Sequence, residues 1–464
     1  MAPEYLRKNR KIRKVYIAGL LLTTSIFCWG CNDDIGAAQS NAVQIDDAQD
    51  RNALEKEAEE ESYFVEEGTD TSKTESAVPD EKVSSEPEET EEKGDAAQDE
   101  RQGEEKERHK VKGIFVTGPM AGTSHMENLI RMVEETELNT MVIDIKNDEG
   151  RVTYDMQVPA VQEIGSDIRH IQDMEALVAK CKEKDIYLIA RIVAFKDPFL
   201  ADVKPEWCIH NSDGSIFRDK GGLAWLNPYN QEVWEYLLVI AKEALHMGFD
   251  EIQFDYIRFS TDSGMDGACF GQEEGEKDRQ EIITDFAAYA AKEVHEAGGI
   301  ISADVYGMVI DSQVDQRIVG QNYVELSRHL DYISPMVYPS HYGPYNYNIK
   351  VPDAEPYQLV LTALQSSRKV LSGIAVTTVS GNMEKEYTSE EIAALTPMEG
   401  VRAQVRPWLQ DFTATWVKGH IPYGAEEIRA QIQAVYDAGY EEWILWNASN
   451  RYTEDGLLRA DESE

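Results

Sequence analysis

The chain has few cysteines, and their spacing suits neither a zinc site nor a disulfide framework. Of the five cysteines in 464 residues, two lie near the N-terminus and three stand alone at Cys181, Cys208 and Cys269. Since no CxxC pair or Cys/His spacing is present, the sequence predicts no zinc or other metal site. The odd number of cysteines in the body of the chain argues against a disulfide framework and leaves room for at most one bridge.

Positive charge is also scarce. The chain has 45 Lys or Arg against 86 Asp or Glu, and from Val111 onward the counts are 30 and 58. Binding to a phosphate backbone requires neutralisation by Lys and Arg. We therefore expect no nucleic acid partner, and the same charge disfavours anionic lipids or teichoic-acid-like polymers as ligands.

Long apolar runs are missing too. The longest, at residues 15–29, has 15 residues, whereas a membrane-spanning helix needs roughly 20. It follows a segment with six Lys or Arg against one Glu, which is typical of a secretory signal sequence. Because the run ends at Gly30-Cys31 and polar residues follow, it resembles a bacterial lipobox, in which the cysteine is lipidated and becomes the new N-terminus.

We therefore expect residues 1–31 to form a signal peptide that ends in lipidation at Cys31. The alternative is an uncleaved signal anchor, because Cys28 and Trp29 stand where a lipobox usually has Leu and a small residue. Both interpretations export the body. They predict a protein at the extracellular face of the cell membrane, attached through its N-terminus, or a secreted one.

The segment from 32 to 110 is expected to be a disordered acidic linker. Residues 46–110 contain 25 Asp or Glu and 9 Lys or Arg with few apolar side chains, and such a stretch buries too little surface to offset its ordering entropy. Charge repulsion should extend it as a spacer. An acidic interaction tail is the alternative, and residues 456–464 form a second, short acidic tail.

From residue 111 to about 455, short β-branched runs alternate with longer amphipathic segments. The expected strands are 113–118, 140–146, 187–195, 251–259, 300–308, 332–339, 401–410 and 442–449. The expected helices are 124–136, 170–184, 230–247, 277–297, 322–330, 355–367 and 425–438. This alternation implies parallel strands with right-handed crossovers, and eight units in about 350 residues fit one (β/α)8 TIM barrel of the α/β class.

A doubly wound open sheet is the alternative fold. It would call for a glycine-rich phosphate-binding turn after the first strand. The segment from Gly118 to Gly122 does not have that pattern, so we expect it to be a plain connecting loop.

Long loops follow several strand C-termini, where a barrel enzyme forms its cleft. They span 196–229, 260–276, 309–321 and 340–354, whereas a further insertion at 368–400 should lie on the opposite face. The first and last of these loops are rich in aromatic residues, which suit the apolar faces of sugar rings or else pack the loops onto the barrel. These residues are Trp207, Trp225, Tyr229, His341, Tyr342, Tyr345 and Tyr347.

Five charged residues near the C-terminal ends of the expected strands are candidates for the barrel lumen. They are Asp144, Lys146, Arg191, Asp255 and Asp304. A barrel strand buries alternate residues, so these side chains should face the lumen, where charge is expensive unless it is paired. Asp144, Lys146 and Arg191 can neutralise one another, which leaves Asp255 and Asp304 as surplus carboxylates.

Asp255 and Asp304 are therefore the candidate catalytic pair. Adjacent strands lie about 4.8 Å apart, so two carboxylates at equal height can flank one glycosidic bond, in either a retaining or an inverting arrangement. Arg191 or Arg258 would keep Asp255 ionised, and Asp304, beside Tyr306, is the candidate acid. The alternative for each is a purely structural salt bridge.

Further residues are candidates for contacts with the substrate. Those around the catalytic pair are Asp144, Lys146, Arg191, Arg258 and Tyr306. Tyr338 on the sixth strand, with Trp446 and Asn447 on the eighth, could form the floor of the cleft or bind hydroxyl groups. Asp148 and Glu149 are rivals of Asp304 for the acid role, although a solvated turn is their other interpretation.

Seven runs between about Gly113 and Tyr452 share a pattern: FVTG, MVIDIKNDEG, LIARIVAFKDP, WLNPYN, EIQFDYIRFS, ADVYGM and YISPMVYPSHY. Together they resemble a glycoside-hydrolase domain family once known only as a domain of unknown function. The resemblance implies a TIM barrel distantly similar to amylase-type hydrolases, in which the carboxylate at the end of the fourth strand is the nucleophile. That role would fall on Asp255. The amylase pattern has Glu as the acid on the fifth strand, whereas this chain has Asp304.

The functional expectation is hydrolysis of an extracellular or cell-envelope polysaccharide without a cofactor. The main rival is a lipoprotein that binds carbohydrate on the same scaffold but has no turnover. A metal-dependent deacetylase or hydrolase would need His and Asp grouped at strand ends, whereas the histidines of the body fall mostly in expected helices or loops.

Overall fold

The computed structural model describes residues 109–271, 276–374 and 387–462. The predicted signal segment, the lipidation site at Cys31 and nearly all of the acidic linker lie outside the described residues. Within the described ranges, no helix is both long and apolar enough to cross a membrane. The three cysteines of the body are free thiols.

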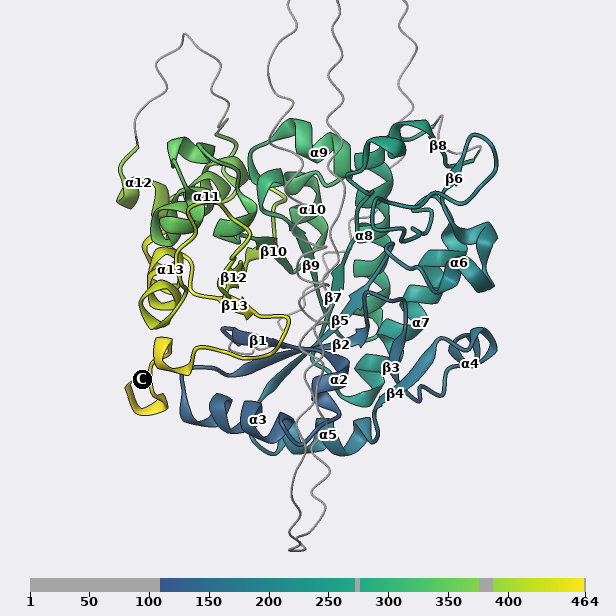
Figure 1. The fold of residues 1–464 in the computed structure, drawn as a ribbon, viewed down its shortest axis with the longest axis horizontal. Helices are drawn as coiled ribbons and strands as arrows, with labels where there is room; N and C mark the ends of the chain where they lie inside the picture. The colour runs from purple at the N-terminus through teal and green to yellow at the C-terminus, as the bar shows by residue number, and fades with distance from the viewer. Residues whose placement is uncertain (1–108, 272–275, 375–386, 463–464) are drawn as a thin grey trace, which may run out of the picture. The chain divides into compact units, whose positions relative to one another are not determined.

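Parallel strands form a closed barrel, as predicted (Figure 1). In barrel order the strands are β1 (Lys112–Val116), β2 (Thr140–Lys146), β5 (Tyr187–Val193), β7 (Glu251–Asp255), β9 (Ile300–Tyr306), β10 (Tyr332–Met336), β12 (Trp408–Gln410) and β13 (Trp443–Trp446). Strand β1 pairs with both β2 and β13, which closes the cylinder. The (β/α)8 fold is confirmed, and the open-sheet alternative is wrong.

The seventh strand is interrupted. Strand β11 (Gln404–Val405) pairs with the first half of β10, and β12 pairs with its last residue, Met336. Pro407 stands between the two pieces. Because proline has no N–H to donate, the ladder breaks there, and Trp408 resumes it beside Met336, at the C-terminal end of β10.

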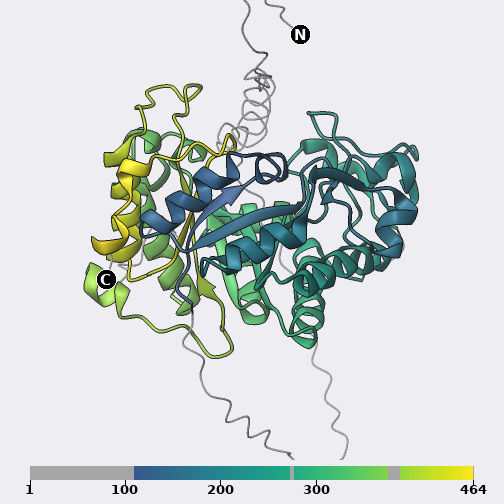
Figure 2. The same cartoon turned by 90° about the horizontal axis from the view of Figure 1, so that it is seen from below.

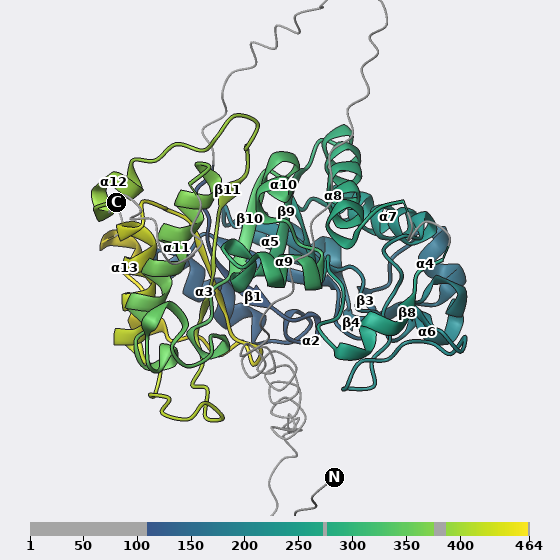
Figure 3. The ribbon, with the colours of Figure 1, turned by 90° about the horizontal axis from the view of Figure 1, so that it is seen from above.

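Amphipathic helices cover the barrel. They are α3 (Met126–Glu135), α5 (Met174–Lys182), α7 (Gln231–Met247), α8 (Arg279–Glu296), α10 (Tyr323–His329), α11 (Pro356–Leu371) and α13 (Ala425–Asp437). The sequence sets their ends: Asp278 and Glu281 form a capping box at the start of α8, and Gly248, with φ 111°, ends α7. Helices α11 and α13 lie on one side of the barrel and α7 and α8 on the other (Figures 1 and 3).

The apolar core has two parts. The larger lies between the strands and the surrounding helices. Figure 2 shows the ribbon of these strands and helices from below. The smaller fills the lumen and consists of Val111, Phe115, Val142, Ile189, Tyr338, Trp408 and Ile444, with Tyr187, Met336 and Trp446 at its edge. These side chains plug the barrel, so any ligand must enter from one end.

An ionic network seals the lumen at the N-terminal ends of the strands. Arg406 Nη1 and Nη2 donate to the two carboxylate oxygens of Glu251 at 2.8 and 3.2 Å, and Nε donates to Glu442 at 3.1 Å. The guanidinium also stacks on the Tyr332 ring at 3.6 Å. Such a fully paired buried network is structural, so chemistry is left to the opposite end.

Several short elements fall where the sequence analysis expected loops or a longer helix. They are α2 (Gly118–Ala121), β3 (Val152–Tyr154), α4 (Pro159–Ile164), β4 (Asp167–Ile171), α6 (Leu200–Val203), β6 (His210–Asn211), β8 (Ala268–Cys269), α9 (Gln313–Val319) and α12 (Ser389–Ala393). The helix expected at 170–184 begins only at Met174, because the Asp173 side chain caps it. Helix α9 has sequence signals at both ends, the Ser312 cap and Gly320 with φ 80°.

Candidate active site

Asp255 and Asp304 both face the lumen at the C-terminal end of the barrel. Phe254 on β7 pairs with Ala303 on β9, so the next residues, Asp255 and Asp304, stand at one level on neighbouring strands about 4.8 Å apart. Both side chains are buried, and Asp304 is only 1% exposed. The structure thus brings the predicted pair together.

Arg191 on β5 holds Asp255 in place. Its Nε and Nη2 donate to Asp255 Oδ2 at 3.0 and 2.5 Å, and the Tyr256 backbone N–H donates to Oδ1 at 2.6 Å. A guanidinium and a backbone amide can only donate, so Asp255 accepts through both oxygens, as a carboxylate does. Charge-assisted bonds of this kind are the stronger class of hydrogen bonds.

The same guanidinium serves two further carboxylates. Its Nη1 donates to Asp144 Oδ1 at 2.6 Å and to Asp148 Oδ2 at 3.2 Å. One positive charge cannot neutralise three negative ones. Burial raises the pKa of Asp144 to about 7, with repulsion from Asp148 and Asp255 adding to it against the attraction of Arg191. For Asp148, burial opposes ionisation, but Arg191 and Lys196 outweigh it and lower the pKa.

Asp304 has a different environment. Its Oδ1 accepts a hydrogen bond from Trp408 Nε1 at 2.6 Å. Burial raises the pKa of Asp304 well above its usual range, and the neighbouring charge of Asp255 adds to the shift. The surroundings of Asp304 therefore favour its protonated form, whereas Asp255 accepts three hydrogen bonds from groups that can only donate. Two carboxyl groups in such different environments are suited to acid and base roles in one site.

The backbone is strained directly after Asp255. Tyr256 has φ 52°, a left-handed conformation that costs a bulky residue roughly 1–3 kcal/mol. Its hydroxyl contacts Lys196 Nζ at 3.2 Å, and its ring lies below that ammonium group. This conformation directs the Tyr256 N–H towards Asp255 Oδ1. The conformational cost therefore helps to position the Asp255 carboxylate.

Lys146 is not part of the carboxylate cluster, contrary to the expected network with Asp144 and Arg191. It is fully buried, pairs with Asp197 at 2.7 Å and donates to the Val193 carbonyl at 2.8 Å. The physical reason is a register shift between Asp144 and Lys146 where β2 pairs with β5, which breaks the expected alternation.

Arg258 and Asn447 are both occupied by the protein itself. The Arg258 guanidinium lies among three rings, those of Tyr306, Tyr256 and Trp225, at 4.4, 4.8 and 5.1 Å. The Asn447 amide donates to the carbonyls of Asp411 and Arg451 and accepts from Ser449. Both residues support the site, Arg258 through aromatic contacts and Asn447 by fixing the loop after β13.

Aromatic side chains gather at the ends of β10, β12 and β13. This aromatic cluster consists of Tyr338, His341, Phe412, Trp416 and Trp446. Tyr338 and Trp446 are 5.5 Å apart between ring centroids, Phe412 and Trp446 5.4 Å, and Phe412 and Trp416 5.9 Å in a near-parallel stack. Trp416 is 37% exposed, so the cluster runs from the lumen to the surface.

The sequence analysis missed Trp408, Phe412 and Trp416. Trp408 lies inside an expected strand, so the alternation of buried residues could have placed it in the lumen. No sequence signal indicated that its partner would be Asp304.

The aromatic residues of the 196–229 loop behave differently: Trp207 donates to Glu232 and Trp225 to Asp219, and both are buried. They pack the loop onto the barrel. Glu149 is exposed at the rim.

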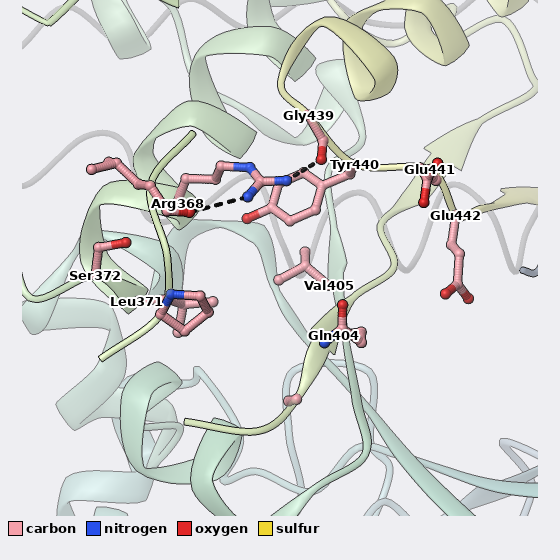
Figure 4. A pocket seen from close by; sticks show the side chains of 12 residues that line it. Arg368, Leu371, Ser372, Gln404, Val405, Gly439, Tyr440, Glu441 and Glu442 are labelled. Atoms are coloured by element: carbon pink, nitrogen blue, oxygen red, sulfur yellow. Dashed lines mark hydrogen bonds between the residues drawn. The ribbon is translucent and has the colours of Figure 1, made fainter. Parts of the chain in front are cut away.

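A separate cavity of about 170 Å³ lies at the opposite end of the barrel, where the 368–400 insertion joins α11 to β11 (Figure 4). Arg368 dominates it. Its guanidinium donates to the carbonyls of Ala438, Gly439 and Leu395 and covers the Tyr440 ring. Two of these bonds join α11 to the turn after α13, and the third joins it to Leu395. The cavity is remote from Asp255 and Asp304.

Comparison with known proteins gives a family. Residues 113–452 match the model of the family described as "Putative glycosyl hydrolase domain". A hypothetical protein from Ruminiclostridium thermocellum is 39% identical over a match that covers 41% of this chain and 97% of that one, with a TM-score of 0.38. Among the curated proteins nothing matches.

A solved structure of low identity shares the fold. The glycoside hydrolase domain of PgaB (BpsB) from Bordetella bronchiseptica is 12% identical, with 73% of this chain and 94% of that one covered and a TM-score of 0.50. The α-galactosidase TtGalA from Thermus thermophilus, also 12% identical, has a TM-score of 0.43 over 76% of this chain and 60% of its own. The chain belongs to the glycosyl hydrolase family whose model it matches, as the seven sequence runs predicted.

Proposed function

We propose that the protein hydrolyses glycosidic bonds in an extracellular or cell-envelope polysaccharide, with Asp255 as nucleophile and Asp304 as general acid and base. The observation that carries the proposal is the pair of lumenal carboxyl groups on adjacent strands in opposite environments. Asp255 accepts from Arg191, whereas burial raises the pKa of Asp304.

The level placement of the two residues favours a retaining reaction, in which the carboxyl groups lie roughly 5–5.5 Å apart. Asp304 gives its proton to the glycosidic oxygen as the C1–O bond breaks, and Asp255 attacks C1 to form a glycosyl ester. Water then attacks C1, Asp304 takes a proton from that water, and Asp255 leaves as a carboxylate. The sugar is released with its original anomeric configuration, which NMR of the first product detects.

The aromatic cluster supports a carbohydrate substrate. Sugar rings present apolar faces that stack on aromatic side chains, and Trp446, Phe412 and Trp416 form a path from the lumen outward. The acidic body adds to the argument, because it disfavours polyanions.

The location is part of the proposal. A lipid at Cys31 or a signal anchor would hold the barrel at the outer membrane face, and the acidic linker would give it reach towards the surrounding wall. Labelling cells with a radioactive fatty acid distinguishes the two: with a lipid the full chain carries label and the Cys31→Ser variant does not, whereas with a signal anchor neither chain carries label.

A polysaccharide panel tests the activity. The wild-type chain should release reducing ends from at least one glycan, and Asp255→Asn and Asp304→Asn should each lose that activity by at least 100-fold while still binding the glycan. Asp285→Asn, on the outer helix α8, is the matched control and should keep full activity. Binding without hydrolysis by the wild-type chain would favour the carbohydrate-binding lipoprotein instead.

A further inference from the structure

A tryptophan on β12, Trp408, contacts the candidate acid. Its side chain is 2% exposed and belongs to the small lumenal core, where its ring meets Phe115 edge-on at 6.3 Å between centroids. Its Nε1 donates to Asp304 Oδ1 at 2.6 Å, whereas the indole N–H groups of Trp225 and Trp234 donate at 2.9 and 2.8 Å. Those two bonds hold a loop and a helix end, but the shorter bond of Trp408 goes to a group of the candidate catalytic pair.

The contact needs a long side chain. Trp408 pairs with Met336 on β10, and Met336 pairs with Tyr306 on β9. Trp408 therefore stands level with Tyr306, two strands away from Asp304 and two residues beyond it. Two strand spacings make roughly 10 Å, and two residues along a strand add roughly 7 Å. An indole, with its donor at the far edge of the ring, spans this separation better than the short side chain of Ser, Thr or Asn.

The four oxygen atoms of the catalytic pair differ in their partners. Both oxygens of Asp255 accept hydrogen bonds, Oδ2 from Arg191 and Oδ1 from the Tyr256 N–H. Asp304 Oδ1 accepts from Trp408. Among the described residues, no hydrogen bond to Asp304 Oδ2 is found, and Oδ2 is not one of the fully buried polar atoms that lack a partner, so it keeps some accessible surface. Of the four oxygens, Oδ2 of Asp304 is therefore the one left to meet a substrate.

This arrangement determines which oxygen of Asp304 carries the proton. An indole N–H can only donate, and a protonated carboxyl group has one O–H and one carbonyl oxygen. The carbonyl oxygen is the stronger acceptor of the two. The bond from Trp408 therefore makes Oδ1 the carbonyl oxygen and leaves the proton on Oδ2.

We propose that Trp408 is a positioning residue for proton transfer, whose indole holds Asp304 Oδ1 so that Oδ2 carries the proton and presents it to the glycosidic oxygen. The inference rests on the proposed function and deepens it. As the C1–O bond breaks, the proton moves from Oδ2 to the leaving oxygen, and the electron pair of the O–H bond stays on Asp304. Oδ1 shares the negative charge that forms, and the N–H is already in place there. Because hydrogen bonds to charged acceptors are stronger, the contact stabilises the transition state more than the ground state.

Packing in the lumen is the alternative role of Trp408, and the two roles predict different pH profiles. Burial and the charge of Asp255 raise the pKa of Asp304, whereas the bond from Trp408 lowers it. Loss of the N–H alone should therefore raise this pKa further, and the alkaline limb of kcat/KM, which reports the acid, should move to higher pH. A loosened lumen would instead admit water, reduce the desolvation of Asp304 and lower its pKa.

Two replacements of Trp408 in the full chain separate these roles. Trp408→Phe removes the donor together with part of the ring system. Replacement of Trp408 by benzothienylalanine, through suppression of a stop codon, keeps the shape of the indole and exchanges its N–H for sulfur. Both variants are assayed on the glycan that the wild-type chain hydrolyses and on the dinitrophenyl glycoside of its sugar. Trp234→Phe, which loses a buried indole N–H on the outer helix α7, is the matched control.

Both variants of Trp408 should hydrolyse the natural glycan about 10- to 100-fold more slowly, the loss expected for a hydrogen bond to a charged group. The burst of dinitrophenolate should keep its rate, because this leaving group departs without a proton. The alkaline limb should move to higher pH, and Trp234→Phe should match the wild-type chain in all three measurements.

The benzothienylalanine variant decides the outcome, because it preserves the packing of the lumen. Unchanged hydrolysis of the natural glycan, equal losses on both substrates, or an alkaline limb that stays or moves to lower pH would overturn the role of Trp408 and leave the proposed function standing. If the wild-type chain hydrolysed no glycan, the proposed function would fall, and the role of Trp408 with it.

Discussion

Arg191 is the centre on which the buried charges depend, so its removal is the most informative perturbation. It is nearly buried and makes hydrogen bonds to Asp144, Asp148 and Asp255. In Arg191→Met the side chain keeps much of its apolar length but loses its charge, which leaves three carboxylates crowded in one low-dielectric space. Breaking a buried ion pair by removing one partner costs about 3–5 kcal/mol.

The cost should depend on pH. Without Arg191, the folded state raises the pKa of its carboxyl groups, because desolvation and mutual repulsion are no longer opposed. A group with a raised folded-state pKa loses stability as the pH climbs from its unfolded value, near 4 for Asp, through the folded value. The loss in Arg191→Met should therefore be full at pH 8 and clearly smaller at pH 5, where the carboxyl groups can take up protons.

Urea unfolding at both pH values measures this loss of unfolding free energy. Arg191→Lys keeps the charge without the fork of donors, so it should lose less than Arg191→Met. Arg131→Met breaks an exposed pair with Glu135 and should change stability by no more than about 0.5 kcal/mol. A loss below about 1 kcal/mol for Arg191→Met, or one that is equal at pH 5 and pH 8, would refute the reasoning.

Two other predictions concern the site. Asp304→Asn should stabilise the fold at pH 8 and not at pH 4. The reason is that the pKa of Asp304 is raised in the folded state, so the wild-type carboxyl group weakens folding once the pH exceeds its pKa in the unfolded chain. Thermal unfolding at the two pH values measures the effect, and equal shifts of the melting temperature at both would count against it. Trp416→Ala should weaken the binding of long oligosaccharides about tenfold without changing the melting temperature. This loss corresponds to roughly 1–1.5 kcal/mol for an aromatic contact. Calorimetry with short and long oligomers checks the prediction, and an equal loss of affinity for both lengths would speak against an extended binding path.

The barrel could be predicted from the sequence because strands buried on both faces appear as short apolar runs. β2 shows this clearly: TMVIDIK is buried along its whole length, and its two charged residues had to face the lumen or break the register. The same argument identified Arg191, Asp255 and Asp304. The excursion from Val152 to Ile171 was missed because β3 and β4 are short and not strongly apolar.

The sequence did not determine which buried side chains pair with one another. Asp144 and Lys146 have the same parity, which suggested one network, but the register shift in β2 sends Lys146 to Asp197. Trp408 donates to Asp304 across the lumen from a strand more than a hundred residues away. Such contacts depend on strand order, tilt and stagger, which a one-dimensional pattern does not contain.

Leaving-group dependence tests the central claim most directly. A panel of glycosides is hydrolysed with two kinds of leaving group, the natural sugar and dinitrophenol, which departs without a proton. Asp304→Asn should lose activity on the natural linkage and keep formation of the glycosyl ester from the dinitrophenyl glycoside, seen as a burst of dinitrophenolate, whereas Asp255→Asn should lose both. Equal losses on both substrates for Asp304→Asn, or full activity of Asp255→Asn on either, would contradict the assignment of the two carboxyl groups.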